Sequence, residues 1–96
     1  MLREQTLECT ICLVSSPDKK KIEATAHLLE YEFDRFFPFW FGVANTCVPA
    51  GDEIQIFDKI MVEFEDGRKG MATAWDVHPR QGVFCLVPFV GVWPLQ

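Results

Sequence analysis

The fold is decided by one segment, Lys59-Ile-Met-Val-Glu-Phe-Glu-Asp-Gly67, in which apolar and polar side chains alternate before an Asp-Gly pair. Every second residue from Ile60 to Phe64 is apolar, a period that is typical of a half-buried β-strand. The Asp-Gly pair accepts the positive φ angles of a tight hairpin turn. The segment therefore predicts a β-hairpin with a return strand from about residue 69 to residue 75.

Shorter β-rich stretches lie on both sides of this hairpin. They cover residues 7–14, 39–44, 54–56, 83–87 and 89–93. Phe57 breaks the alternation ahead of the hairpin, so a bulge or bend is expected there. Residues 78–82 predict a loop, and Pro88 predicts an edge or bend between the last two strands. About five strands, from residue 39 onward, are expected to form a bent antiparallel small β-barrel.

One long helix is expected between the first strand and the barrel. Ser16 suits the N-cap and Pro17 suits the first helical position. An apolar stripe at helical spacing follows, made of Ile22, Ala26, Leu29 and Phe33. Pro38 ends the pattern, because the residue before a proline is pushed out of the helical region. These signals predict a helix from about residue 17 to residue 36.

One strand, one helix and a run of strands together predict an α+β fold. The 96 residues suffice for one hydrophobic core, so a single domain is expected over residues 1–96. The helix is expected to pack on one face or one open end of the barrel.

The chain is acidic, with 14 Asp and Glu against 9 Lys and Arg and a net charge of −5. This balance predicts no binding to nucleic acid or to membranes, and it favours a basic protein partner. The apolar stretch at residues 36–44 is too short for a membrane-spanning helix. Residues 1–5 lead directly into a charged segment, so we expect no signal peptide and a cytoplasmic location with reduced cysteines.

The hairpin and the residues after it resemble small Sm-like barrels. The shared features are the alternating strand, the Asp66-Gly67-Arg68 turn, Gly70, Trp75-Asp76 and Phe84-Cys-Leu86. The same run resembles an uncharacterised bacterial small-barrel domain found beside PilZ domains. The resemblance covers residues 59–88 and implies a strongly bent antiparallel barrel. Sm-like barrels have three residues where this chain has Lys69 alone, between Arg68 and Gly70, so their RNA-binding role does not carry over.

Six aromatic residues crowd into nine positions where the predicted helix ends. Two interpretations stay open: packing between helix and barrel, or a partly exposed docking patch. The candidate partner-binding residues are Phe37, Phe39, Trp40, Phe41 and Trp93.

The best candidates for polar chemistry are Asp76, His78 and Cys85. Residues two apart in a strand share a face, so Asp76 could orient His78 as a base, or both could bind a metal ion together with Cys85. The alternative is a hairpin turn in which Asp76 and His78 satisfy backbone donors. Cys9 and Cys12 lie three apart, on opposite faces of a strand, and are expected to be buried small side chains.

The sequence contains no nucleophile elbow, phosphate-binding loop or paired-carboxylate pattern. We therefore expect a non-enzymatic interaction or regulatory module without a cofactor. It would dock a protein partner, or form a homodimer, through the aromatic residues. The alternative is a metal- or small-ligand-binding barrel that uses Asp76, His78 and Cys85.

Overall fold

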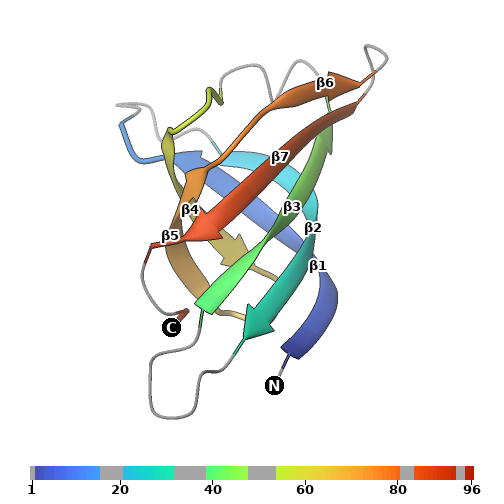
Figure 1. Ribbon diagram of the computed structural model, residues 1–96, viewed down its shortest axis with the longest axis vertical. Coiled ribbons are helices and arrows are strands. Elements are labelled where there is room, and N and C mark those ends of the chain that lie inside the picture. The colour runs from blue at the N-terminus through green and yellow to red at the C-terminus, as the bar shows by residue number, and fades with distance from the viewer. Residues whose placement is uncertain (1, 16–20, 32–38, 48–53, 81–83, 93–94) are drawn as a thin grey trace.

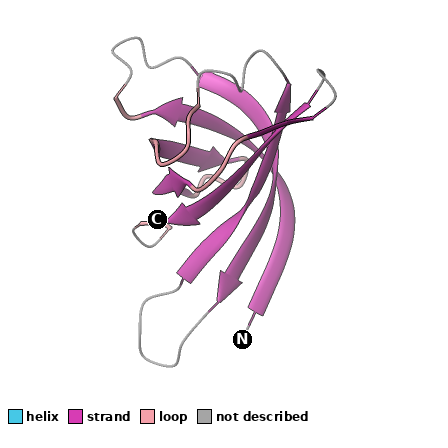
Figure 2. Cartoon of the chain, turned by 45° about the horizontal axis from the view of Figure 1, so that its top comes forward, coloured by secondary structure: helices cyan, strands magenta, loops and turns pink. Residues whose placement is uncertain are grey.

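The computed structural model describes residues 2–15, 21–31, 39–47, 54–80, 84–92 and 95–96. The strands are β1 (Leu2–Leu13), β2 (Lys21–Tyr31), β3 (Phe39–Cys47), β4 (Lys59–Phe64), β5 (Lys69–Ala74), β6 (His78–Arg80) and β7 (Phe84–Gly91). Within these ranges the regular structure is entirely β, and no segment is helical (Figure 2). Consequently none of the described residues forms a helix of the length and hydropathy that membrane crossing requires.

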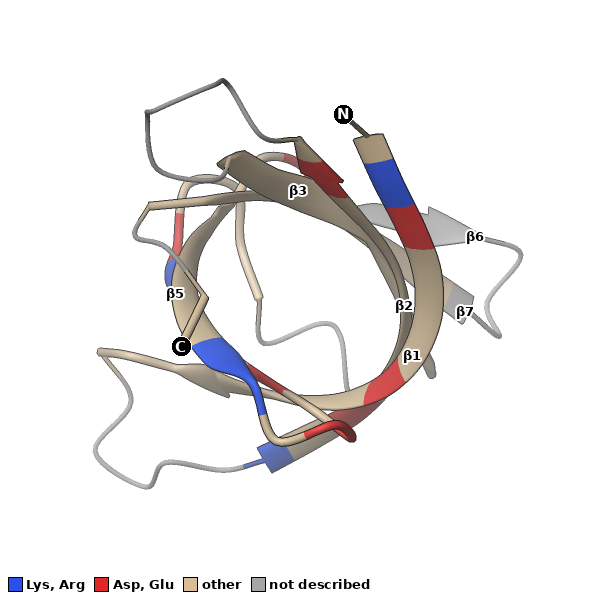
Figure 3. Cartoon of the chain, turned by 90° about the horizontal axis from the view of Figure 1, so that it is seen from below, with Lys and Arg blue, Asp and Glu red and all other residues tan. Residues whose placement is uncertain are grey.

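Six of the strands close into one antiparallel barrel. Around the barrel the order is β1, β2, β3, β7, β5 and β4, and β4 pairs again with β1. The closing ladder joins β3 to β7, from Phe41 opposite Val90 to Cys47 opposite Phe84. β6 pairs with the first residues of β7, outside the closed ring. Figure 1 shows the ring from the side of β7, and Figure 3 shows it from below.

The expected helix over residues 17–36 is wrong, because residues 21–31 form β2 in the middle of the sheet. Side chains in β2 are buried at every second position, Ile22, Ala24, Ala26 and Leu28. A period of two matches a strand, and its partners β1 and β3 satisfy the backbone on both sides. The remaining ends of the expected helix, residues 17–20 and 32–36, lie outside the described residues. The fold is therefore all-β, not α+β.

The C-terminal strands also differ from the expected order. Residues 78–80 form the short strand β6 instead of a loop, and β7 runs without interruption through Pro88. Proline is tolerated there because its position, where an N–H is missing, falls in the gap between the β6–β7 and β5–β7 ladders, so no ladder hydrogen bond is lost. The β6 ladder ends at Leu86 and the β5 ladder begins at Phe89. The expected small barrel is thus confirmed, with six strands in the ring rather than about five.

Trp40 lies inside the barrel and is 2% exposed. Its ring packs near those of Phe64 and Phe89, with centroid distances of 6.3 Å and 5.9 Å. A six-stranded ring encloses a narrow space, so large rings require small neighbours. The core includes five fully or nearly buried alanines, Ala24, Ala26, Ala44, Ala72 and Ala74.

Candidate functional site

The outer surface of the barrel has one apolar face. β3 and β7 contain no Asp, Glu, Lys or Arg, as the tan colour of β3 in Figure 3 shows. Their outward side chains continue onto the end of β2. We define the apolar face as Leu29, Tyr31, Phe39, Phe41, Val43, Leu86, Pro88 and Val90, which neighbour one another in the sheet register.

The aromatic residues predicted to contact a partner divide between this face and the core. Phe39 is 39% exposed and Phe41 is half-buried, with ring centroids 5.4 Å apart. Trp40 alternates with them and points into the barrel, so it is a core residue and not a docking residue. The other two candidates, Phe37 and Trp93, lie outside the described residues.

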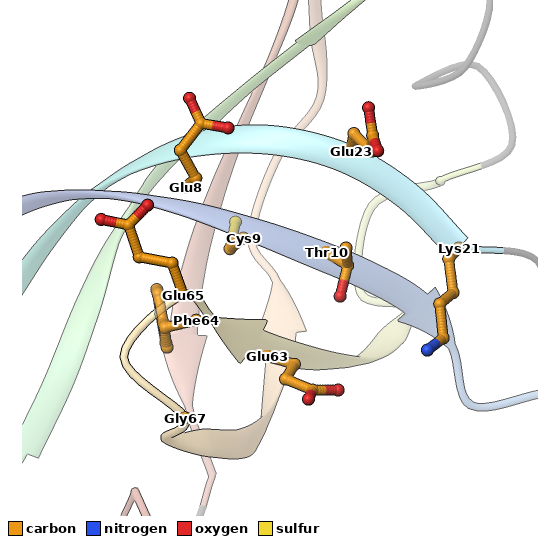
Figure 4. A pocket seen from close by; sticks show the side chains of 9 residues that line it. All are labelled: Glu8, Cys9, Thr10, Lys21, Glu23, Glu63, Phe64, Glu65 and Gly67. Atoms are coloured by element: carbon orange, nitrogen blue, oxygen red, sulfur yellow. The ribbon is translucent and has the colours of Figure 1, made fainter.

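An acidic face lies across the barrel from the apolar face, on β1, β2 and β4. It surrounds a hollow of about 450 Å³ and carries Glu8, Glu23, Glu63 and Glu65, with Lys21 at its edge (Figure 4). Glu8 and Glu65 are direct neighbours, because the Glu65 N–H donates to the Glu8 carbonyl at 2.9 Å. None of the ion pairs between described residues includes these four carboxylates. Among the residues that the structure describes, most exposed carboxylates thus gather on one side of the molecule.

The predicted metal site of Asp76, His78 and Cys85 stays a prediction. Cys85 is 0% exposed inside the barrel, and its partner in the β6–β7 register is Pro79 rather than His78. The Asp76 Oδ1 accepts the N–H of Val77 at 2.7 Å. The side chain of His78 lies outside the described residues. Among the residues whose side chains are described, no group of three His, Cys, Asp or Glu residues has metal-binding geometry.

Cys9 and Cys12 lie on opposite faces of β1, as expected. Cys9 is buried in the core, whereas Cys12 is half-buried on the outside, so the expected burial is correct for Cys9 and wrong for Cys12. Burial, and to a smaller extent the charge of Glu8, raises the pKa of the Cys9 thiol to about 11. At neutral pH this sulfur is therefore a protonated thiol, which is a poor nucleophile and a poor metal ligand.

The Asp66-Gly67-Arg68 turn, which belongs to the resemblance to Sm-like barrels, has a structural role in this protein. Arg68 forms ion pairs with Glu30 and with Asp66, and it donates a hydrogen bond to Gln5 at 2.9 Å. Burial lowers the pKa of Arg68, but the hydrogen bonds and charges of Glu30 and Asp66 more than offset it and hold the pKa above its usual value. The guanidinium therefore ties β1 and β2 to the β4–β5 turn.

A second aromatic cluster was not predicted from the sequence. Phe57 and Trp75 are 61% and 58% exposed, and their rings meet at 85° with centroids 5.8 Å apart. Phe57 also has a positive φ of 68°, which is unusual for a residue other than glycine. The broken alternation at Phe57 indicated the bend, but nothing local indicated that its ring would meet Trp75.

Comparisons with protein-family models, with curated proteins and with solved structures found no match to this chain. The resemblance to Sm-like and PilZ-associated barrels therefore stays a prediction.

Proposed function

We propose that this protein is a non-enzymatic interaction module that self-associates through the apolar face. The observation that carries the proposal is the absence of charged residues from both β3 and β7, on a face where Tyr31 and Phe39 are 38% and 39% exposed. Contiguous exposed apolar surface of this kind is typical of interaction sites.

The distribution of charge favours a second copy of the chain as the occupant. Each copy carries a net charge of −5, so two copies repel wherever their carboxylates approach. Three of the four carboxylates of the acidic face lie on β1 or at β4, across the barrel from β7 and β3. The fourth, Glu23, lies near the start of β2, whereas the apolar face uses the end of that strand. When two apolar faces meet, the acidic faces point away from each other, and repulsion is at its smallest.

The size of the face sets the expected strength of the dimer. Three neighbouring strands at about 4.8 Å spacing and about 20 Å of strand length give roughly 300 Å² of flat surface. A standard interface buries about 800 Å² per partner, so the apolar face belongs to the small and weak class. We expect a dissociation constant on the order of 10 µM.

Sedimentation velocity between about 1 and 500 µM tests the proposal against this expected constant. The wild-type protein should shift from monomer to dimer across this range, and Val43→Glu should stay monomeric because it places a charge in the apolar face. Thr25→Glu is the control, since Thr25 is an exposed outward residue that precedes Leu29 in β2 and lies outside the apolar face. A wild-type protein that stays monomeric at every concentration would overturn self-association. If Val43→Glu and Thr25→Glu dimerise equally well, the dimer interface would lie outside the apolar face.

A further inference from the structure

Phe57 and Trp75 form an aromatic corner that is separate from the apolar face. Phe57 precedes β4 and Trp75 follows β5, so the two rings stand at one end of the β4–β5 hairpin. They meet nearly at a right angle, 85°, and both keep more than half of their surface exposed. We call this pair the aromatic corner.

The backbone of Phe57 itself has a strained conformation. Its φ angle of 68° lies in the left-handed region, which bulky residues rarely adopt. Two hydrogen bonds fix the conformation: Phe57 N–H donates to the Ala74 carbonyl at 2.6 Å, and Ala74 N–H donates to the Asp58 carbonyl at 2.8 Å. A ring that is 61% exposed gains little from burial. Strain without a packing gain points to binding rather than to stability.

The chemistry of the corner fits a cation. The faces of aromatic rings are electron-rich and attract positive charge, most strongly at Trp. Asp58 and Asp76 directly follow the two aromatic residues in the chain, and the whole molecule carries a net charge of −5. A cationic group that approaches the corner is therefore attracted by the rings and by the field of the protein.

The surface that the corner itself offers narrows the class of cation, because the two rings carry no strong hydrogen-bond acceptor and the backbone already uses one oxygen of each neighbouring carboxylate. Asp58 Oδ2 accepts the N–H of Gln55 at 2.8 Å, and Asp76 Oδ1 accepts the N–H of Val77 at 2.7 Å. A primary ammonium needs several hydrogen-bond acceptors to replace its water, whereas a quaternary ammonium needs none. We propose that the aromatic corner binds a quaternary or fully methylated ammonium group.

Lys59 provides an internal test of this proposal. The Lys59 Nζ donates a hydrogen bond to Thr73 Oγ1 at 3.0 Å. This bond holds the positive charge of Lys59 on the β4–β5 hairpin, two residues from Phe57 in the chain. That charge opposes a bound cation. At about 8 Å in water the repulsion corresponds to an affinity roughly two- to threefold lower. Lys59→Met should therefore tighten cation binding, whereas it would leave an uncharged ligand unaffected.

The experiment is an NMR titration of the ¹⁵N-labelled protein with choline, followed on the amide signals of residues 57–59 and 74–76. The matched probe is 3,3-dimethyl-1-butanol, which has the same shape without the charge. Choline should cause saturable shifts with a dissociation constant in the millimolar range, and the alcohol should bind about tenfold more weakly. Equal shifts with both compounds would show a merely apolar patch and overturn the proposal, as would a choline response that does not saturate.

Two variants of Phe57 separate the ring from the backbone strain. Phe57→Gly removes both, so it should raise Tm and lower choline affinity about tenfold. Phe57→Leu removes the ring and keeps the strain, so it should lower the affinity without the rise in Tm. Unchanged choline affinity in both folded variants would overturn the proposal, because the rings would then have no part in binding.

Discussion

Trp40 is accommodated because glycines face it where other residues would collide. A Cβ atom placed on Gly91 would overlap the indole ring, and one placed on Gly70 would press against it. Leu95 lies beside Trp40 against the same face of Gly70, so the C-terminal residues close this end of the core. The largest side chain of the interior thus depends on two residues that have no side chain.

Gly91→Ala should destabilise the protein by about 2–3 kcal/mol, because the added methyl group overpacks the space that Trp40 occupies. Urea unfolding measures the change. Gly67→Ala is the control: open space surrounds it, and only its φ of 93° opposes a side chain, at a cost of about 1 kcal/mol. Combining Gly91→Ala with Trp40→Phe should cost less than the sum of the two single changes. Strict additivity would show that the two residues do not touch.

Cys9 should make the free energy of unfolding depend on pH in the alkaline range. Its pKa is raised from 9.0 to about 11 in the folded state, so the thiol ionises more readily in the unfolded chain. The stabilisation is complete below pH 9 and is lost as the pH rises towards 11, in total about 3 kcal/mol. Urea unfolding between pH 8 and 11 should therefore show a smaller loss for Cys9→Ala than for the wild type. Parallel curves would contradict the burial of the thiol.

At the scale of elements, the hairpin was the most predictable part of the chain. The alternation of Ile60, Val62 and Phe64 and the positive φ of Gly67 are local properties, and the structure confirms both. The placement of Cys9 and Cys12 on opposite faces of β1 was also correct. β2 was not, because Ile22 and Ala26 fit a helical and an extended period equally well. Only Ala24 and Leu28, at the remaining alternate positions, favour a strand over a helix. Ala24 is weak evidence for a strand, because alanine is small and is a strong helix former.

A pair of substitutions in β2 separates the strand from the expected helix. Ala24 is 7% exposed inside the barrel, whereas Leu29 is half-buried on the outside. The helical stripe would require the opposite, with Leu29 in the core. Ala24→Glu should therefore prevent folding or cost more than about 3 kcal/mol, and Leu29→Glu should leave a folded monomer. Circular dichroism and thermal melting measure both, and a folded Ala24→Glu protein beside an unfolded Leu29→Glu protein would contradict the strand.

At the scale of the whole molecule, ring closure could not be predicted from local patterns. β3 and β7 are far apart in the sequence, and neither strand signals its partner. Closure nevertheless decides which aromatic side chains reach the surface, because it directs Trp40 inward and Phe39 and Phe41 outward. The aromatic cluster was therefore predicted as a group, but its division between core and surface was not. The separation of the apolar and acidic faces likewise appears only when the strands are arranged in a ring.

The most direct test of this account is a set of NMR distance measurements between β3 and β7 in the labelled protein. The closed barrel predicts backbone NOEs along the whole ladder, including those between Ala44 and Val87 and between Phe41 and Val90. It also predicts extended-strand chemical shifts for residues 21–31. Absence of the β3–β7 NOEs, or helical shifts in residues 21–31, would contradict the closed barrel and remove the basis for the apolar face.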